Sequence, residues 1–190
     1  GAVDLAMRRN LVLDTPVLVA TDAAKSLLKA ASVLSWTNSK ITDRPLAGEG
    51  LGAQLTLQGG MLDMSGHVAT DGISQLTLVG DQEVRLRPLI NDALTGGYVG
   101  GLNTAADVVI KAPQLVGSTA TQYTLDASGR SLTIEGGDPL AAAPLSVGAN
   151  LTFKAATIDQ KGTIQAPFGQ ITLSATERVT LHEGSVTSVS

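Results

Sequence analysis

The chain has 190 residues, with 21 glycines, 3% aromatic residues, no cysteine and a formal net charge of −4. The slightly acidic charge excludes a basic nucleic-acid footprint, the lack of cysteine excludes a disulfide-stapled or Cys-ligated metal domain, and 43% hydrophobic content excludes a disordered chain. A core of aliphatic residues with few large rings favours a repetitive β architecture over a compact globule.

Short stretches in which apolar and polar residues alternate predict strands along the whole chain. The first is 11–13, followed by residues 22–31, which fit a helical turn capped by Asp22 as well as a strand through 26–28. Further on, the alternation places Leu76, Leu78, Val84 and Leu86 inside, and it places Thr77, Arg85 and Arg87 outside.

The strand motifs recur at a nearly constant spacing, which is typical of a repeat protein. Residues 54–57 (QLTL) return identically at 75–78, a shift of 21, and 151–155 align with 171–175, a shift of 20. Units this short cannot bury an apolar face alone, so they must stack on one another. The spacing predicts an all-β fold, a right-handed parallel β-helix of roughly eight coils, as one continuous segment over 1–190.

Equivalent inward positions of successive coils, about 4.8 Å apart, should stack into aliphatic ladders. A third match, at a shift of 19, aligns residues 131–134 with 150–153. One wall of the helix is predicted to contain Leu55, Leu57, Leu76, Leu78, Leu132, Ile134, Leu151, Phe153, Ile171 and Leu173. A second wall is predicted to contain Met64, Val84, Leu86, Ile158, Val179 and Leu181.

Three stretches that contain proline or paired glycines predict surface loops at 38–50, 88–104 and 136–149. Long loops on a repetitive scaffold are where binding tends to occur. Trp36 and Tyr98 lie in or beside these loops and are the candidate ligand contacts, through stacking of a ring on a sugar. The alternative for such a lone ring is that it caps the open end of the coil.

Two groups of basic residues are candidate sites. His67 and His182 are far apart at predicted turns, so solvent-facing histidines are favoured over metal ligands. Arg85 and Arg87, together with Arg44, would form a small anion patch, but arginine at outward strand positions is more often a solubility device. No metal or cofactor is therefore expected.

Carboxylates are a further group of candidates because parallel β-helices also include polysaccharide-acting enzymes. Asp63, Asp81 and Glu83 would approach one another if their coils align, and so would Glu135 and Asp138. Acid/base chemistry or Ca²⁺ binding needs such clusters on one outer face. Scattered solvating charges are favoured here, and no catalytic residues or enzyme activity are predicted.

A resemblance to a known family is found in the last third of the chain. Residues 162–175 read GTIQAPFGQITLSA and residues 179–190 read VTLHEGSVTSVS. This pattern closely resembles filamentous haemagglutinin-type exoproteins, with the specific match over 151–190. The resemblance implies a β-helical shaft of a large secreted or cell-surface protein, which a dedicated β-barrel partner exports across the bacterial outer membrane. The Asn-Pro-Asn motifs of the family's secretion domain do not occur here.

The sequence thus predicts an internal shaft segment of a secreted filamentous adhesin that mediates surface display, adhesion or cell–cell and biofilm contact. The expected partners are the outer-membrane secretion barrel, a receptor or glycan on a host or bacterial surface, and further copies of the chain, associated end to end through unpaired strand edges. Two alternatives stand beside it: a β-helical enzyme acting on polysaccharide, and the stalk of a contact-dependent toxin-delivery exoprotein.

Overall fold

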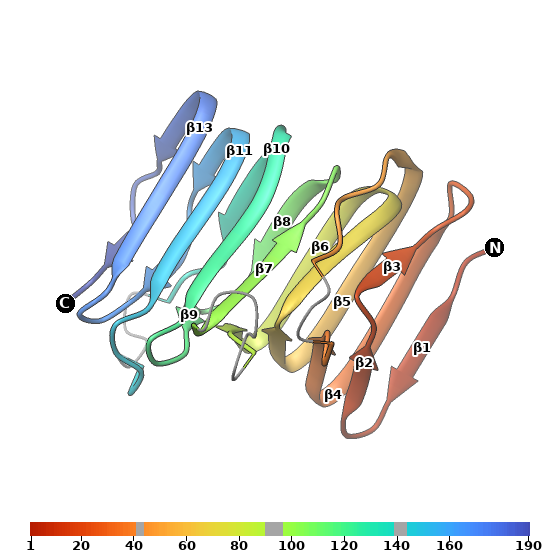
Figure 1. The fold of residues 1–190 in the computed structure, drawn as a ribbon, viewed down its shortest axis with the longest axis horizontal. Helices are drawn as coiled ribbons and strands as arrows, with labels where there is room; N and C mark the ends of the chain where they lie inside the picture. The colour runs from red at the N-terminus through yellow and green to blue at the C-terminus, as the bar shows by residue number, and fades with distance from the viewer. Residues whose placement is uncertain (41–43, 90–96, 139–143) are drawn as a thin grey trace.

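The computed structural model describes residues 1–40, 44–89, 97–138 and 144–190, and it is a parallel β-solenoid of about seven turns (Figure 1). All the strand pairs in these ranges are parallel, which confirms the predicted fold class. The described residues form no helix, so none of them belongs to a helix that could span a membrane.

The strands follow one another around the axis and are numbered in chain order. In the described residues they are β1 (Asp4–Met7), β2 (Leu11–Asp14), β3 (Val17–Val19), β4 (Lys25–Thr37), β5 (Gly50–Ser65), β6 (His67–Arg87), β7 (Val99–Asn103), β8 (Asp107–Lys111), β9 (Leu115–Gly117), β10 (Gln122–Glu135), β11 (Asn150–Gln160), β12 (Thr163–Gln165), β13 (Gln170–Leu181) and β14 (Val186–Ser188). The long strands bend around a corner and contribute to more than one face.

Three faces, here called A, B and C, make up each full coil. Face A contains β1, the first parts of β4 and β5, the middle of β6, β8, and the second parts of β10, β11 and β13. Face B contains β2, the ends of β4, β5 and β6, and then β9, β12 and β14. Face C contains β3, the start of β6, β7, and the first parts of β10, β11 and β13.

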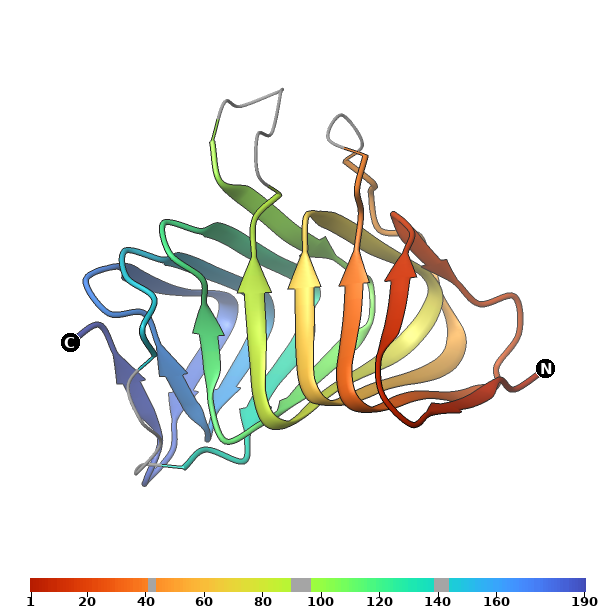
Figure 2. The ribbon, with the colours of Figure 1, turned by 90° about the horizontal axis from the view of Figure 1, so that it is seen from below.

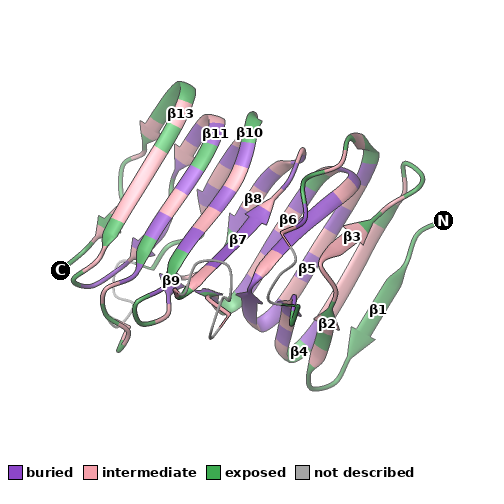
Figure 3. Ribbon diagram, viewed as in Figure 1, coloured by how far each residue is buried: buried purple, intermediate pink, exposed green. Residues whose placement is uncertain are grey.

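The core is the aliphatic bore enclosed by the three faces. In face A, Leu57, Leu78, Ile110 and Ile134 follow one another along the axis, and none is more than 2% exposed. Each such side chain stabilises the fold by roughly 1.5–3 kcal/mol through burial. Thr77 lies between buried neighbours on the outward side, as the alternation predicts, and Figure 3 shows this alternation along the strands.

The third predicted repeat match is wrong. Leu132 pairs with Ile158, 26 residues later, and not with Leu151. Residues 131–134 lie in face A, whereas 150–153 lie in face C. The two stretches look alike only because both are short alternating strands, so similarity alone does not place them on one wall.

The coils differ in length, and this is why the two predicted walls mix faces. Leu57 pairs with Leu78, 21 residues on, but Leu78 pairs with Ile110, 32 residues on. A constant spacing near 20 therefore predicts the wrong pairing partners after each loop. The misassigned residues are Leu151, Phe153, Ile171 and Leu173, which lie in face C, and Ile158, Val179 and Leu181, which lie in face A.

Residues 22–31 resolve in favour of a strand. β4 begins at Lys25 and continues through the face A corner, and Leu28 pairs with Leu5 on one side and Leu57 on the other. The helical alternative is wrong because the backbone N–H and C=O groups of this segment pair with β1 on one side and β5 on the other. In a helix, the same groups would bond within the segment.

Two of the three predicted loops each replace a strand in one face. After β4, the described residues 38–40 and 44–49 form no strand in face C, and β3 pairs directly with β6, with Val17 opposite Ala69. After β10, the described residues 136–138 and 144–149 form no strand in face B, and β9 pairs directly with β12, with Leu115 opposite Ile164. At each missing strand, the strands of the coils before and after it pair directly with each other.

The third predicted loop is shorter than expected. Its second part, 99–103, is strand β7, because Val99–Asn103 pairs with β6 and β10. The described flanks of 38–49 and 88–98 leave the solenoid on the same side (Figure 2). Parts of the predicted loops, residues 41–43, 90–96 and 139–143, lie outside the described residues.

Candidate functional site

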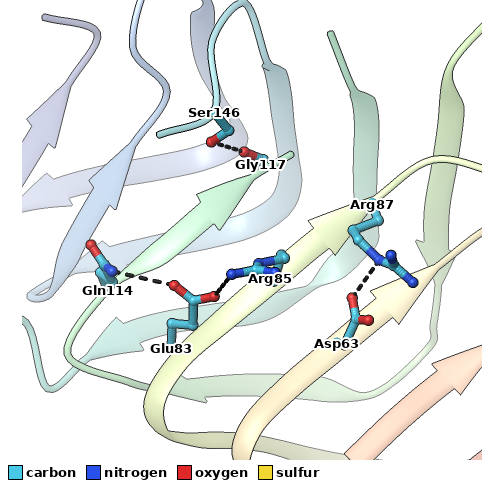
Figure 4. Close-up of polar contacts among 7 residues, drawn as sticks. All are labelled: Asp63, Glu83, Arg85, Arg87, Gln114, Gly117 and Ser146. Atoms are coloured by element: carbon cyan, nitrogen blue, oxygen red, sulfur yellow. Dashed lines mark hydrogen bonds and ion pairs between the residues drawn. The ribbon is translucent and has the colours of Figure 1, made fainter. Parts of the chain in front are cut away.

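A group of polar side chains lies on the outer side of face B, where β5, β6 and the start of β9 are neighbours (Figure 4). The alternation that turns Val84 and Leu86 into the bore turns the residues between them outward. We call this group the face-B cluster, and it consists of Asp63, Glu83, Arg85, Arg87 and Gln114.

The members of the face-B cluster are joined in two chains of contacts. Arg87 Nε lies 2.8 Å from Asp63 Oδ1, and Arg85 forms an ion pair with Glu83. Gln114 Nε2 donates a hydrogen bond of 3.3 Å to Glu83 Oε2. The two carboxylate side chains are 12% exposed and the arginines 39% and 47%, so each carboxylate lies beneath a guanidinium.

The buried acceptor atoms of this cluster differ in whether they have a partner. Asp63 Oδ1 and Glu83 Oε1 are each paired with an arginine, and a side-chain hydrogen bond with Arg87 lowers the pKa of Asp63. Gln114 Oε1 is buried and has no partner among the described residues. A buried acceptor left without a partner costs about 1–3 kcal/mol, so the Gln114 amide is the strained member of the cluster.

Burial also changes two pKa values at this place. It raises the pKa of the Asp63 carboxyl above its ordinary value, and the nearby Arg87 and Arg85 charges oppose this effect while Glu83 adds to it. Burial raises the pKa of the Tyr123 hydroxyl, and the negative charge of Asp63 raises it further. Tyr123 therefore stays protonated, with its hydroxyl oxygen buried and without a hydrogen-bond partner among the residues that the structure describes.

A groove of about 580 Å³ opens beside the cluster, with Glu83, Arg85, Arg87 and Gln114 on one side and residues 144–146 on the other. The second wall is fixed in place because Ser146 Oγ donates to the Gly117 carbonyl at 2.6 Å (Figure 4). The described residues 144–146 line the groove beside face B, at the point where β9 pairs directly with β12. Loop and strand outer surface together define the site.

Trp36, one of the two candidate ligand contacts, is a core residue. Its side chain is fully buried, and its indole N–H donates to the Thr15 carbonyl at 3.1 Å. The ring therefore offers no surface on which a sugar could stack. Tyr98 is 52% exposed at the position just before β7, and a contact between Tyr98 and a ligand stays a prediction.

Of the first carboxylate group, the structure brings Asp63 and Glu83 to the same outer face but not Asp81. In the register between β5 and β6, Asp63 lies opposite Arg85, and Glu83 lies two positions before Arg85 on the same side of the strand. Asp81 lies at the corner between faces A and B, where its Oδ1 accepts from Gln58 Nε2 at 3.2 Å.

In the second carboxylate pair, the Glu135 carboxylate is engaged with a lysine. Glu135 forms an ion pair of 2.9 Å with Lys111, and the backbone N–H of Asp138 donates to the Pro113 carbonyl at 2.8 Å. Among the residues that the structure describes, no three His, Asp or Glu side chains come close enough to hold a metal ion.

The histidines both contact a charged side chain. His67 Nε2 lies 2.8 Å from Arg44 Nη1, and His182 Nε2 lies 3.1 Å from Asp159 Oδ1. Arg85 and Arg87 are paired with carboxylates, so these two residues do not form the uncompensated anion patch considered from the sequence.

Sequence reasoning did not find Gln114 or the wall formed by residues 144–146. Gln114 contacts Glu83, which lies 31 residues earlier, and no local pattern signals that contact. The loop itself was predicted at 136–149, but its position against face B depends on which strand it replaces. The signal that was available is the break in repeat spacing after residue 135.

Comparison of the chain with protein-family models, with curated proteins and with solved structures found no match. The fold and the site together define the class: a parallel β-solenoid protein with a polar groove on one outer face. Any narrower identity rests on the proposals below.

Proposed function

We propose that this chain is a structural shaft segment of a secreted filamentous haemagglutinin-like adhesin, exported across the bacterial outer membrane, that holds binding regions away from the cell surface. The observation that carries the proposal is the ladder of face A, which continues from β1 to β13 without a missing strand. Because each coil packs mainly on its neighbours, such a rod gains length without needing a larger core.

The stretch that resembles the exoprotein family supports the same function. Residues 162–190 form β12, β13 and β14, so the motif corresponds to the last coil of the solenoid. Gly169 stands at a corner where a Cβ atom would lie 1.9 Å from the Ala149 carbonyl oxygen, and Gly184 has a φ of +80°. The glycines of the motif therefore stand where the corners of a coil require them.

Antibodies against residues 1–190 test the proposal on the organism that encodes the chain. We expect them to label intact cells, and we expect deletion of the gene to reduce adhesion to host cells or biofilm contact. Loss of the outer-membrane secretion barrel should leave the protein inside the cell envelope. Labelling that appears only after permeabilisation would overturn the proposal. The stalk of a toxin-delivery exoprotein would also be labelled, and its gene would continue into a toxin domain.

A second candidate function, a polysaccharide-acting enzyme, is favoured by one observation. Asp63, with its raised pKa, and Glu83 lie on the same face beside a groove, as acid/base chemistry on a sugar chain would need. The test is release of reducing ends from polysaccharides by the purified chain, compared with D63N and E83Q. We expect no release by the native chain, and a release that both variants abolish would establish the enzyme.

A further inference from the structure

The first and last coils, at opposite ends of the solenoid, contain equivalent positions of one inward ladder in face A (Figure 1). Leu5 in β1 lies opposite Leu28 in β4. From Leu28 the register continues to Leu181 in β13 through five buried positions: Leu57, Leu78, Ile110, Ile134 and Gln160. Leu5 and Leu181 are 39% and 63% exposed, so among the described residues the ladder lacks a neighbour only at its two ends.

The corner between faces A and B has the same length in both end coils. In face B, the register leads from Leu11 in β2 to Thr187 in β14. Leu11 follows Leu5 by six positions, and Thr187 follows Leu181 by six positions. If the first coil of one copy is laid on the last coil of another, β1 therefore continues the ladder of β13 while β2 continues that of β14, without a bulge between them.

Face C is the one face in which this junction would skip a strand. Among the described residues no strand of face C follows β14, so β3 of the second copy would come after the first part of β13. The structure already contains a junction of this kind. β3 pairs directly with β6, although the described residues 38–40 and 44–49 between them form no strand in face C. A missing strand in one face is therefore compatible with continuous pairing in the other two.

The two end coils also differ in shape. At the first coil the bore opens into a largely apolar hollow of about 350 Å³, whose lining includes Val3, Leu18 and Leu28. At the last coil Val179 and Leu181 are 41% and 63% exposed. Two first coils placed together would set a hollow against a hollow and would reverse the strand direction, whereas all the described strand pairs are parallel. Contact between a first and a last coil keeps the parallel direction and covers both apolar surfaces.

Charges at the corner between faces A and B favour the same contact. Arg8 and Arg9 are exposed at this corner of the first coil, and Glu183 is exposed at the equivalent corner of the last coil. Among the residues that the structure describes, none of these three side chains forms an ion pair. Opposite charges at equivalent corners select a first coil as the partner of a last coil.

We propose that this chain binds further copies of itself head to tail, with the last coil of one copy stacked on the first coil of the next. Leu181 then packs against Leu5, and Glu183 lies beside Arg8 and Arg9. The contact joins two different surfaces and repeats the step between coils, so it adds copies into an open filament. Direction and register are thereby added to the end-to-end association expected from the sequence, and neither depends on secretion or adhesion.

Disulfide trapping tests this direction and register, because the chain has no cysteine of its own. Leu5→Cys and Leu181→Cys are introduced together, and the purified chain is oxidised at high concentration and separated on a non-reducing gel. Paired positions on neighbouring strands are about 4.8 Å apart, which a disulfide spans, so we expect covalent dimers, trimers and larger species. Either substitution alone should give no covalent dimer, because only contact between like ends would join two identical positions.

Met7→Cys combined with Leu181→Cys is the matched control for the register. Met7 lies two positions beyond Leu5 in β1, so in the proposed contact it is about 8 Å from Leu181. A disulfide does not span more than about 7 Å between Cα atoms, and this variant should stay monomeric on the gel. Circular dichroism should show the same β content in both double variants.

Three results would overturn the proposal: equal trapping by the two double variants, dimers of a single variant, or a strictly monomeric native chain in sedimentation at high concentration. The native chain needs no substitution, so the last measurement decides even if a variant does not fold. Surface labelling of intact cells without trapping would reject this inference and leave the shaft function standing. Trapping without surface labelling would do the reverse.

Discussion

Faces A and B of the solenoid are built from similar strands but differ in what the structure does with them. Face A has a strand in every coil from β1 to β13, with aliphatic side chains stacked along the bore. Face B lacks the strand after β10, and beside this gap lie the charged cluster and the groove. The continuous face holds every coil to the next, whereas the interrupted face is the one whose outer surface carries a polar groove.

The missing strand leaves no unpaired edge. β9 and β12 close over it, with Leu115 opposite Ile164, and the backbone N–H of Asp138 still donates to the Pro113 carbonyl at 2.8 Å. An insertion at this point is therefore tolerated, because the ladder on both sides is restored and loop length itself adds little entropic cost.

The first prediction breaks the continuous face. Leu57→Ala removes a fully buried side chain from the middle of the face A ladder. We expect the free energy of unfolding to fall by about 2–5 kcal/mol, the range for such cavities, in denaturant titrations followed by circular dichroism. Thr56→Ala, which changes the outward neighbour, should stay within about 0.5 kcal/mol of the native chain. A loss below about 1 kcal/mol for Leu57→Ala would contradict a tightly packed bore.

The second prediction compares two glycine corners, one crowded by the direct pairing of β3 with β6 and one with open space around it. Gly72 has a φ of +75°, and a Cβ there would lie 1.8 Å from the Ala20 carbonyl oxygen, which direct pairing of β3 with β6 brings close. Gly129 has a φ of +77° and open space around it. Gly129→Ala should cost about 1–2 kcal/mol from the left-handed backbone alone. Gly72→Ala should cost clearly more in thermal and denaturant unfolding, and equal losses would show that the corner is not tight.

The third prediction concerns a buried amide between the last two coils. Gln160 Oε1 accepts from the Gly162 N–H at 3.1 Å, while its Nε2 donates to the Gly162 carbonyl at 3.1 Å and to the Val186 carbonyl at 3.0 Å. Gln160→Ala leaves these groups unpaired, so the unfolding free energy should fall by about 1–3 kcal/mol. Amide exchange should accelerate in β14 and not in β8. Unchanged exchange in β14 would show that Gln160 does not hold the last coil.

The fold was predictable where no loop intervenes. The QLTL motif at 54–57 and at 75–78 lies in exact register, and so do 151–155 and 171–175. The match of 131–134 with 150–153 failed because the strands that truly pair are separated by coils of other lengths. Spacing therefore predicts an architecture well, but it predicts the register only between coils without insertions.

The site was less predictable than the fold, for two different reasons. Trp36 could have been placed correctly, because Leu34 and Trp36 alternate with Ser35 and both lie in the bore. The prediction of a ligand contact instead relied on the position of Trp36 beside the predicted loop at 38–50. Gln114 could not have been found. Its partner Glu83 lies 31 residues earlier, in the preceding coil, and the sequence does not show how many residues this coil contains.

The fourth prediction concerns the two ends, where neither face is covered. Leu5 and Leu181 are 39% and 63% exposed on the first and last coils, and the outer strands there, β1 and β13, are the ends of the described strand order. We expect the isolated chain to associate end to end, seen as a concentration-dependent rise in sedimentation coefficient. Leu181→Lys should reduce this association, because charge on an edge strand opposes pairing. A strict monomer at high concentration would contradict it.

The smallest expected effect is the pH dependence of the last coil. A hydrogen bond from His182 is the main cause that lowers the pKa of Asp159. Slight burial raises this pKa, and the positive charges of His182, Lys161 and Arg178 lower it further. Because the folded pKa lies below the unfolded value of about 3.9, the stabilisation is complete above that pH and is lost as the pH falls through the folded pKa. The pair is exposed, so the change in melting temperature should be small.

Carbon-detected NMR titration of the Asp159 carboxyl measures this directly. Its midpoint should lie below that of a free aspartate, and it should move upward in His182→Gln, which removes the charge and alters the hydrogen bond. Asp14 is an internal control, because its pKa is lowered by hydrogen bonds from Ser39 at the other end of the solenoid and should not respond to that substitution. An unchanged Asp159 midpoint in His182→Gln would show that the contact with His182 does not set the pKa, and that the exposed C-terminal coil gains nothing from it.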